Sequence, residues 1–101
     1  MIFVAGTLSI APEQVADFEA AVAEMRPKVL EEAGCYHYSL LVEDRAAGLI
    51  NVIEAWEDDE ALKVHLGQPW IATFFNRFSP HITGMSAQVY DALNARPIPM
   101  G

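Results

Sequence analysis

The residue types best suited to chemistry lie together between Glu54 and His65, where a carboxylate, an indole and an imidazole occur close in sequence. Glu54 and Trp56 stand two residues apart in an apolar, β-prone stretch, so they point to the same face of a strand. His65 follows in an acidic, helix-like segment, and its side chain falls on the apolar side. The three groups can therefore meet between a sheet and its covering helix. There they would hold an aromatic ring and move a proton.

Each of these three residues has two interpretations. Trp56 is either a pocket wall for an aromatic ring or a core aromatic covered by the helix. His65 either takes a proton from a substrate or is a helix histidine bonded to a backbone carbonyl or to Glu54. Glu54 is the only acid inside an apolar run, so it needs a partner or a raised pKa. A bond to His65 or to a helix-end amide would supply that partner.

Other aromatic residues are candidates for binding a substrate. Tyr36 and Tyr38 alternate along a neighbouring strand, and we expect them to share a face and bring a phenol near the pocket. Trp70 and Phe74 belong to a short, aromatic-rich helical piece that forms either core or pocket lid. The three histidines are far apart in sequence and a second cysteine is absent, so we predict no metal site.

Composition narrows the classes of partner. The net charge of −8 with only six Lys and Arg argues against nucleic acid and anionic membranes, because phosphate contacts need cations. No apolar run approaches the ~20 residues of a membrane span, and the first residues lack a basic leader pattern. A single cysteine fits a reducing compartment, so we expect a cytoplasmic protein. At 101 residues the chain predicts one domain, residues 1–101.

Local patterns predict alternating strands and helices. Apolar residues spaced by three and four indicate an amphipathic helix from Pro12, which Pro27 should kink or restart and Gly34 should cap. A polar, glycine-ended segment predicts a hairpin, and Asp58 or a neighbour should cap the second helix. The predicted strands are Ile2–Ile10, Cys35–Glu43, Leu49–Trp56 and His81–Leu93, with a helical piece at Trp70–Phe78 and an irregular tail at about 94–101.

This element order is β-α-β-β-α-β, the ferredoxin-like α+β plan with an antiparallel sheet and helices on one face. In the third strand both faces are mainly apolar, whereas a sheet with one face in water should alternate cleanly. We therefore predict a homodimer in which sheet packs against sheet. The bulkier side chains should face the helices, and these are Ile50, Val52, Glu54 and Trp56. The smaller set should face the partner, and these are Leu49, Asn51, Ile53 and Ala55.

The motifs Gly34-Cys35-x-x-Tyr38, Glu54-x-Trp56 and Glu60-Ala61-Leu62-x-x-His65 together resemble the antibiotic biosynthesis monooxygenase (ABM) domain family. This resemblance implies a small dimeric α+β barrel that uses neither metal nor flavin. It further implies that a phenol, quinol or anthrone is held as its anion in a dry pocket and itself reduces dioxygen. His65 would act as base or anion stabiliser, Trp56 would line the pocket, and Glu54 would orient His65.

The chain departs from two branches of that family. Polyketide-oxidising members resemble one another in an Asn-x-x-x-Trp arrangement on this strand. In this chain the position four before Trp56 is Val52. Haem-degrading members favour an asparagine on the first strand, where this chain reads Gly6-Thr7-Leu8. Two alternatives stay open beside the monooxygenase. One is an isomerase of a small oxygenated metabolite that uses the same pocket, and the other is a non-catalytic dimeric ligand-binding domain.

Overall fold

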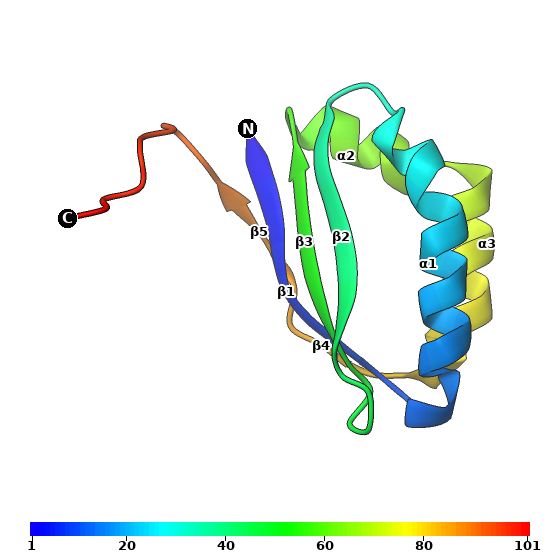
Figure 1. Ribbon diagram of the computed structural model, residues 1–101. Coiled ribbons are helices and arrows are strands. Elements are labelled where there is room, and N and C mark those ends of the chain that lie inside the picture. The colour runs from blue at the N-terminus through cyan, green and yellow to red at the C-terminus, as the bar shows by residue number, and fades with distance from the viewer.

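The computed structural model describes residues 1–101 and contains one antiparallel sheet with helices on one of its faces (Figure 1). The strands are β1 (Ile2–Ile10), β2 (Cys35–Asp44), β3 (Leu49–Trp56), β4 (Ile82–Met85) and β5 (Gln88–Asp91). The helices are α1 (Val15–Leu30), α2 (Asp59–Leu66) and α3 (Pro69–Phe78), with short 3₁₀ turns at Pro12–Gln14 and Ser79–His81.

The five-stranded sheet has the order β2-β3-β1-β4, and β5 also pairs with β1. Every pairing is antiparallel. Three helices pack on one face of the sheet, and the residues after Asp91 extend away from the body on the opposite side (Figure 1). This arrangement confirms the predicted ferredoxin-like α+β fold.

The prediction of a single last strand from His81 to Leu93 is wrong. His81 ends a 3₁₀ turn, and the strand then breaks between Met85 and Gln88 into β4 and β5. At the break the backbone crosses Gly6 so closely that an added Cβ would lie 2.6 Å from the Cα of Ala87. Both pieces still pair with β1, at different ends of it. A close approach of the two backbones therefore interrupts the regular pairing of the last strand with β1 between Met85 and Gln88.

Helix α1 follows its predicted amphipathic pattern but does not restart at Pro27. The helix continues to Leu30, and its predicted apolar face is buried, namely Val15, Phe18, Val22 and Met25. Pro27 cannot donate to the carbonyl of Ala23, but both residues are exposed, so water can satisfy that carbonyl. Gly34 is not the cap, because Glu31 ends the helix and Gly34 turns the following loop with φ of +79°.

The face of β3 that was predicted to pack against the helices does so. Ile50, Val52, Glu54 and Trp56 are all buried there, among side chains of the helices. On the open face Ile53 is 45% exposed and Asn51 is exposed, while Ala55 is buried. Asp58 caps α2 as predicted, since its Oδ1 accepts from the Ala61 N–H at 2.9 Å. The alternation of β3 therefore separates a covered face from an open one.

Candidate active site

A largely apolar cavity of about 240 Å³ lies between the covered face of the sheet and the helices. Seventeen residues line it, and 15 of them are hydrophobic. Those still exposed mark its mouth, between α2 and α3 on one side and β4 and β5 on the other, and these are Leu66, Phe75, Met85 and Val89. The break in the last strand matters here, because β4 and β5 each contribute a residue to this mouth.

Few polar groups reach the cavity. Glu54 and His65 line it, as does Tyr38, and no lysine or arginine does so. None of the three free polar atoms, His65 Nε2, Glu54 Oε2 and the Tyr38 hydroxyl, makes a hydrogen bond. None of these three atoms is fully buried either, since Glu32 Oε1 is the only fully buried side-chain polar atom without a hydrogen-bond partner. Each of the three therefore keeps accessible surface on a residue that lines the cavity.

His65 is held by a carboxylate that the sequence did not indicate. Its Nδ1 lies 2.8 Å from Oε2 of Glu32, and the His65 residue is only 2% exposed. If Glu32 is the carboxylate, it has no proton to give and Nδ1–H is the donor of this hydrogen bond. The other nitrogen, Nε2, is then left as the proton-accepting atom of neutral His65. This arrangement is what a general base needs.

Trp56 lies behind the cavity and does not line it. The residue is fully buried, its ring lies 4.6 Å from that of His65 between centroids, and its Nε1–H donates to Glu54 Oε1 at 3.0 Å. The interpretation of Trp56 as a pocket wall is therefore wrong for this cavity. The indole instead supports two groups that do line it, His65 through its face and Glu54 through its N–H.

Glu54 does not hold His65, so that part of the prediction is also wrong. Its hydrogen bond goes to Trp56, while Glu32 takes the place expected for Glu54. Burial raises the pKa of Glu54 above its ordinary value of 4.5; the Trp56 N–H and the charge of His65 act in the opposite direction. Whenever Glu54 is protonated its proton is on Oε2, because Oε1 accepts from the indole N–H.

The two tyrosines separate, contrary to the expectation that they share a face. Tyr38 is 3% exposed, lines the cavity and meets His65 edge-on at 5.4 Å between ring centroids, and burial raises its pKa. Tyr36 is 58% exposed. The pairing of β2 with β3 shifts register between Cys35 and His37, so Cys35 and not Tyr36 is aligned with Trp56. An extra residue in one strand reverses the side-chain alternation.

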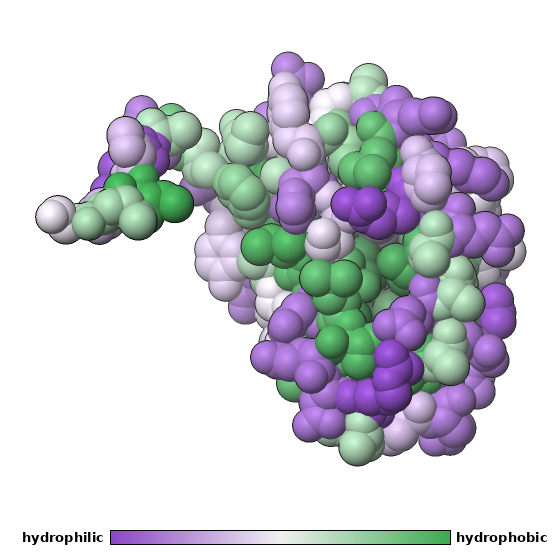
Figure 2. Space-filling model, viewed as in Figure 1, coloured by the Kyte–Doolittle hydropathy of each residue, from purple (hydrophilic) through white to green (hydrophobic).

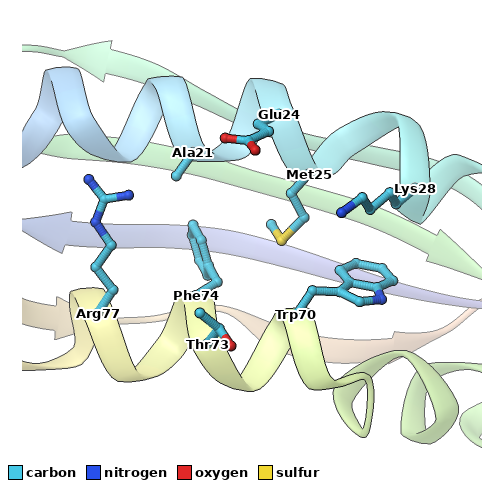
Figure 3. A pocket seen from close by; sticks show the side chains of 8 residues that line it. All are labelled: Ala21, Glu24, Met25, Lys28, Trp70, Thr73, Phe74 and Arg77. Carbon is cyan, nitrogen blue, oxygen red and sulfur yellow. The ribbon is translucent and has the colours of Figure 1, made fainter.

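The two helix aromatics also have different places. Phe74 lines the cavity and packs on Phe18 and Phe78 at 5.3 and 5.1 Å between ring centroids. Trp70 does not line it; its ring lies 6.2 Å from that of His65. Figure 3 shows Trp70 and Phe74 facing α1 across a second, shallower hollow that also contains Met25 and Lys28. Trp70 is therefore a support on the far side of His65.

Glu32 was missed because it stands in an acidic pair at a helix end, which is typical of a solvated surface. Gly34, two residues later, is the signal that was available. Its carbonyl accepts from Glu57 N–H at 2.8 Å, and an added Cβ would lie 2.8 Å from Cβ of Ala61. The loop is thus pressed onto the start of α2, the helix that carries His65. This contact brings Glu32 to the imidazole.

The remaining chemistry-bearing residues form no further centre. No group of three or more His, Cys, Asp or Glu side chains is arranged to hold a metal ion. Burial raises the pKa of the Cys35 thiol, which keeps it protonated and weakly nucleophilic. None of the helices is both long and apolar enough to cross a membrane.

Solved structures similar to this chain share its fold. A candidate antibiotic biosynthesis monooxygenase from Caulobacter crescentus CB15 is 28% identical with a TM-score of 0.81, and the match covers 92% of this chain and 90% of that one. Another from Deinococcus radiodurans is 24% identical with a TM-score of 0.84, over 100% of both chains. A protein from Mycobacterium tuberculosis is 21% identical with a TM-score of 0.79, over 95% of this chain and 98% of that one. The last two likenesses show the fold alone.

The family is shown by a sequence model. No curated protein is similar enough to this chain to count as a match. The family model described as antibiotic biosynthesis monooxygenase matches residues 1–77, which is well over half of the chain and includes β1 through α2 and most of α3. The resemblance carried by the segment from Gly34 to His65 is thereby confirmed. The protein belongs to the antibiotic biosynthesis monooxygenase family.

Proposed function

We propose that this protein is a cofactor-independent monooxygenase that oxidises a small aromatic quinol, phenol or anthrone with dioxygen. The observation that supports it most is the cavity itself, an apolar space whose lining includes a histidine held by a carboxylate through Nδ1. Apolar walls suit an aromatic ring and exclude water, and the histidine suits removal of one proton. Membership of the family makes this chemistry the first to test.

The cavity also limits the substrate. Its volume of about 240 Å³ is below the ~300–1,000 Å³ usual for drug-sized ligands, which favours a one-ring or two-ring quinol or phenol over the three fused rings of an anthrone. With no lysine or arginine in the lining, a phosphate or carboxylate on the substrate would be buried without a partner. The substrate is therefore neutral apart from the hydroxyl that meets His65.

The proposed reaction runs in four steps. His65 Nε2 takes the proton of the substrate, and the imidazolium that forms is stabilised by Glu32 at 2.8 Å. The anion passes one electron to dioxygen, and the two radicals combine to form a carbon–oxygen bond. The peroxide takes a proton, either back from His65 or from neutral Glu54. The O–O bond then breaks, a hydrogen on the same carbon is lost, water leaves, and that carbon becomes a carbonyl.

The isomerase alternative has its own support in Glu54. Glu54, whose pKa is raised by burial, and His65 line one cavity and would together form an acid–base pair, which is the requirement for moving a proton between two atoms of a substrate. Such a reaction needs no oxygen. It would act on an oxygenated metabolite that presents a hydroxyl to His65 and a carbonyl to Glu54.

The homodimer is a further part of the proposal. On the open face Phe3 lies opposite both Ala55 and Tyr90, and Ala5 lies opposite Ile53, so apolar side chains are contiguous across three strands. Among them Ile53 and Tyr90 are about half exposed. Figure 2 shows further apolar side chains on the tail, which extends from this side of the molecule. An exposed apolar surface of this kind on a sheet favours a second sheet as partner.

Oxygen uptake distinguishes the candidate functions. Purified protein is given one-ring and two-ring quinols and anthrones, with and without chelator, in an oxygen electrode. We expect chelator-resistant uptake that falls ~10²–10⁴-fold in His65→Gln, because the amide can still donate to Glu32 but cannot act as a base. The control is His37→Gln, at an exposed histidine on β2. Product formed without oxygen would instead identify the isomerase, and neither uptake nor product would favour the ligand-binding domain.

A further inference from the structure

We propose that Glu32 is a positioning residue, which fixes the tautomer of His65 so that the lone pair of Nε2 faces the cavity. Glu32 does not line the cavity and touches no substrate there. Its action is exerted through the 2.8 Å hydrogen bond to Nδ1. The consequence for catalysis rests on the proposed function, but the tautomer itself is a property of the free protein.

The backbone around Glu32 is tied down on both sides. Its own N–H donates to the carbonyl of Val29 at 3.0 Å, and its carbonyl accepts from Cys35 N–H at 3.2 Å. Beyond it, the Gly34 carbonyl is bonded to Glu57, at the start of the segment leading into α2. The carboxylate is thus fixed relative to α1, β2 and α2 together. A side chain held in this way gives the imidazole one orientation.

The incomplete pairing of Glu32 argues that its charge is used. The side chain is 9% exposed, Oε2 is bonded to His65, and Oε1 is fully buried without a partner. A carboxylate that served only packing would be expected to have both oxygens satisfied, since an unpaired buried oxygen costs stability. A negative charge beside His65 has its largest effect when the ring gains a proton, which is the step assigned to His65.

The surroundings of His65 leave the tautomer to Glu32. The ring lies against Trp56 at 4.6 Å and edge-on to Tyr38 at 5.4 Å between centroids, and neither makes a hydrogen bond to its nitrogens. Glu54 is the other acid nearby, and its bonded oxygen is taken by the indole. If Nδ1 lost its acceptor, the ring proton would be free to move to Nε2. The proton-accepting atom would then point away from the cavity.

The test measures the tautomer directly by ¹⁵N NMR of the histidine rings at a pH where His65 is neutral. His65 is assigned with the His65→Gln and His37→Gln variants. In the wild type we expect the proton on Nδ1, and a proton on Nε2 would overturn the proposal without any variant. In Glu32→Met, which keeps the volume but removes the acceptor, we expect the signal to shift toward the Nε2–H form. An unchanged tautomer would also overturn the proposal.

Two further variants complete the experiment. Glu31→Gln changes the neighbouring exposed glutamate and should leave the tautomer and any activity unchanged. Glu32→Gln keeps a carbonyl acceptor and should retain the Nδ1–H form in part. If oxygen uptake is found, Glu32→Met should lower kcat ~10–100-fold with little change in KM, because Glu32 does not line the cavity. A larger rise in KM than fall in kcat would contradict positioning. If uptake is absent but the tautomer depends on Glu32, only the monooxygenase proposal fails.

Discussion

The two faces of β3 are both rich in apolar residues, yet they have opposite fates. On the covered face Glu54 and Trp56 are buried and support a cavity, while on the open face Ile53 remains 45% exposed. The covered face gains its chemistry from two other elements, the loop after α1, which is distant in sequence, and helix α2, which follows β3 directly. The open face gains nothing within one chain. The contrast is what we expect if the first face serves the proposed ligand and the second the proposed homodimer.

The largest effect should come from removing Trp56 on the covered face. Trp56→Ala would leave a cavity and deprive Glu54 of its hydrogen bond, so we expect a loss of ~3–5 kcal/mol in the free energy of unfolding. Trp56→Phe keeps a ring against His65 and should cost only ~1–3 kcal/mol. Urea unfolding measures both. Equal losses in the two variants would mean that packing of the indole against His65 contributes little.

The open face should respond through association and not through folding. Ile53→Asp places a charge in the proposed interface of both protomers, and we expect the dimer to weaken by about 2 kcal/mol or more, roughly 30-fold in Kd. Val64→Asp is the matched control, since Val64 is 55% exposed but lies on the helix side. Analytical ultracentrifugation gives the result. A wild type that stays monomeric would rule out the homodimer, and equal weakening in both variants would rule out this face.

The mouth of the cavity offers a test of intermediate size. Val89→Arg on β5 places a cation at the mouth, and we expect KM for a neutral aromatic to rise about 10-fold with kcat nearly unchanged. Ala72→Arg adds the same charge to an exposed position on α3 that lines neither hollow. Binding of an aromatic probe, followed by fluorescence, measures the same change without turnover. A rise in KM in the control alone would place the entrance elsewhere.

The smallest effect is expected in the pH dependence of stability. Because burial holds the pKa of Glu54 above its ordinary value of 4.5, its contribution to stability is complete below that pH. The contribution is lost as the pH rises through the raised pKa, since the unfolded chain has already released the proton. Glu54→Gln cannot titrate, so its unfolding free energy relative to wild type should rise between about pH 4.5 and pH 8. A difference that stays constant over this range would contradict the assignment.

Much of the fold could be predicted because it depends on local patterns. The spacing of Val15, Phe18 and Val22 indicates one buried helix face, and α1 buries it. Alternation in β3 places Glu54 and Trp56 on the helix side, and Asp58 caps α2 as expected. Each of these features is set by residues within a few positions of one another. Helical and strand periods fix such features before any tertiary contact forms.

The candidate site was only half predictable from local patterns. Glu54, His65, Tyr38 and Phe74 do line one cavity, whereas Tyr36 is turned outward by a shift in register and Trp56 and Trp70 stand behind His65. A register shift depends on how two strands pair, and one residue more or less reverses every side chain beyond it. Nothing in the sequence of β2 alone contains that information.

The sequence by itself determined the order of the main helices and strands, the buried faces of α1 and β3, and the family to which the chain belongs. Only the tertiary structure decided that Glu32 and not Glu54 holds His65, and that a break over Gly6 lets β4 and β5 form the mouth of the cavity. The reason is physical. Periodicity specifies which side of an element is apolar, but a hydrogen bond between residues 33 positions apart depends on how a helix end, a turn and a second helix pack together.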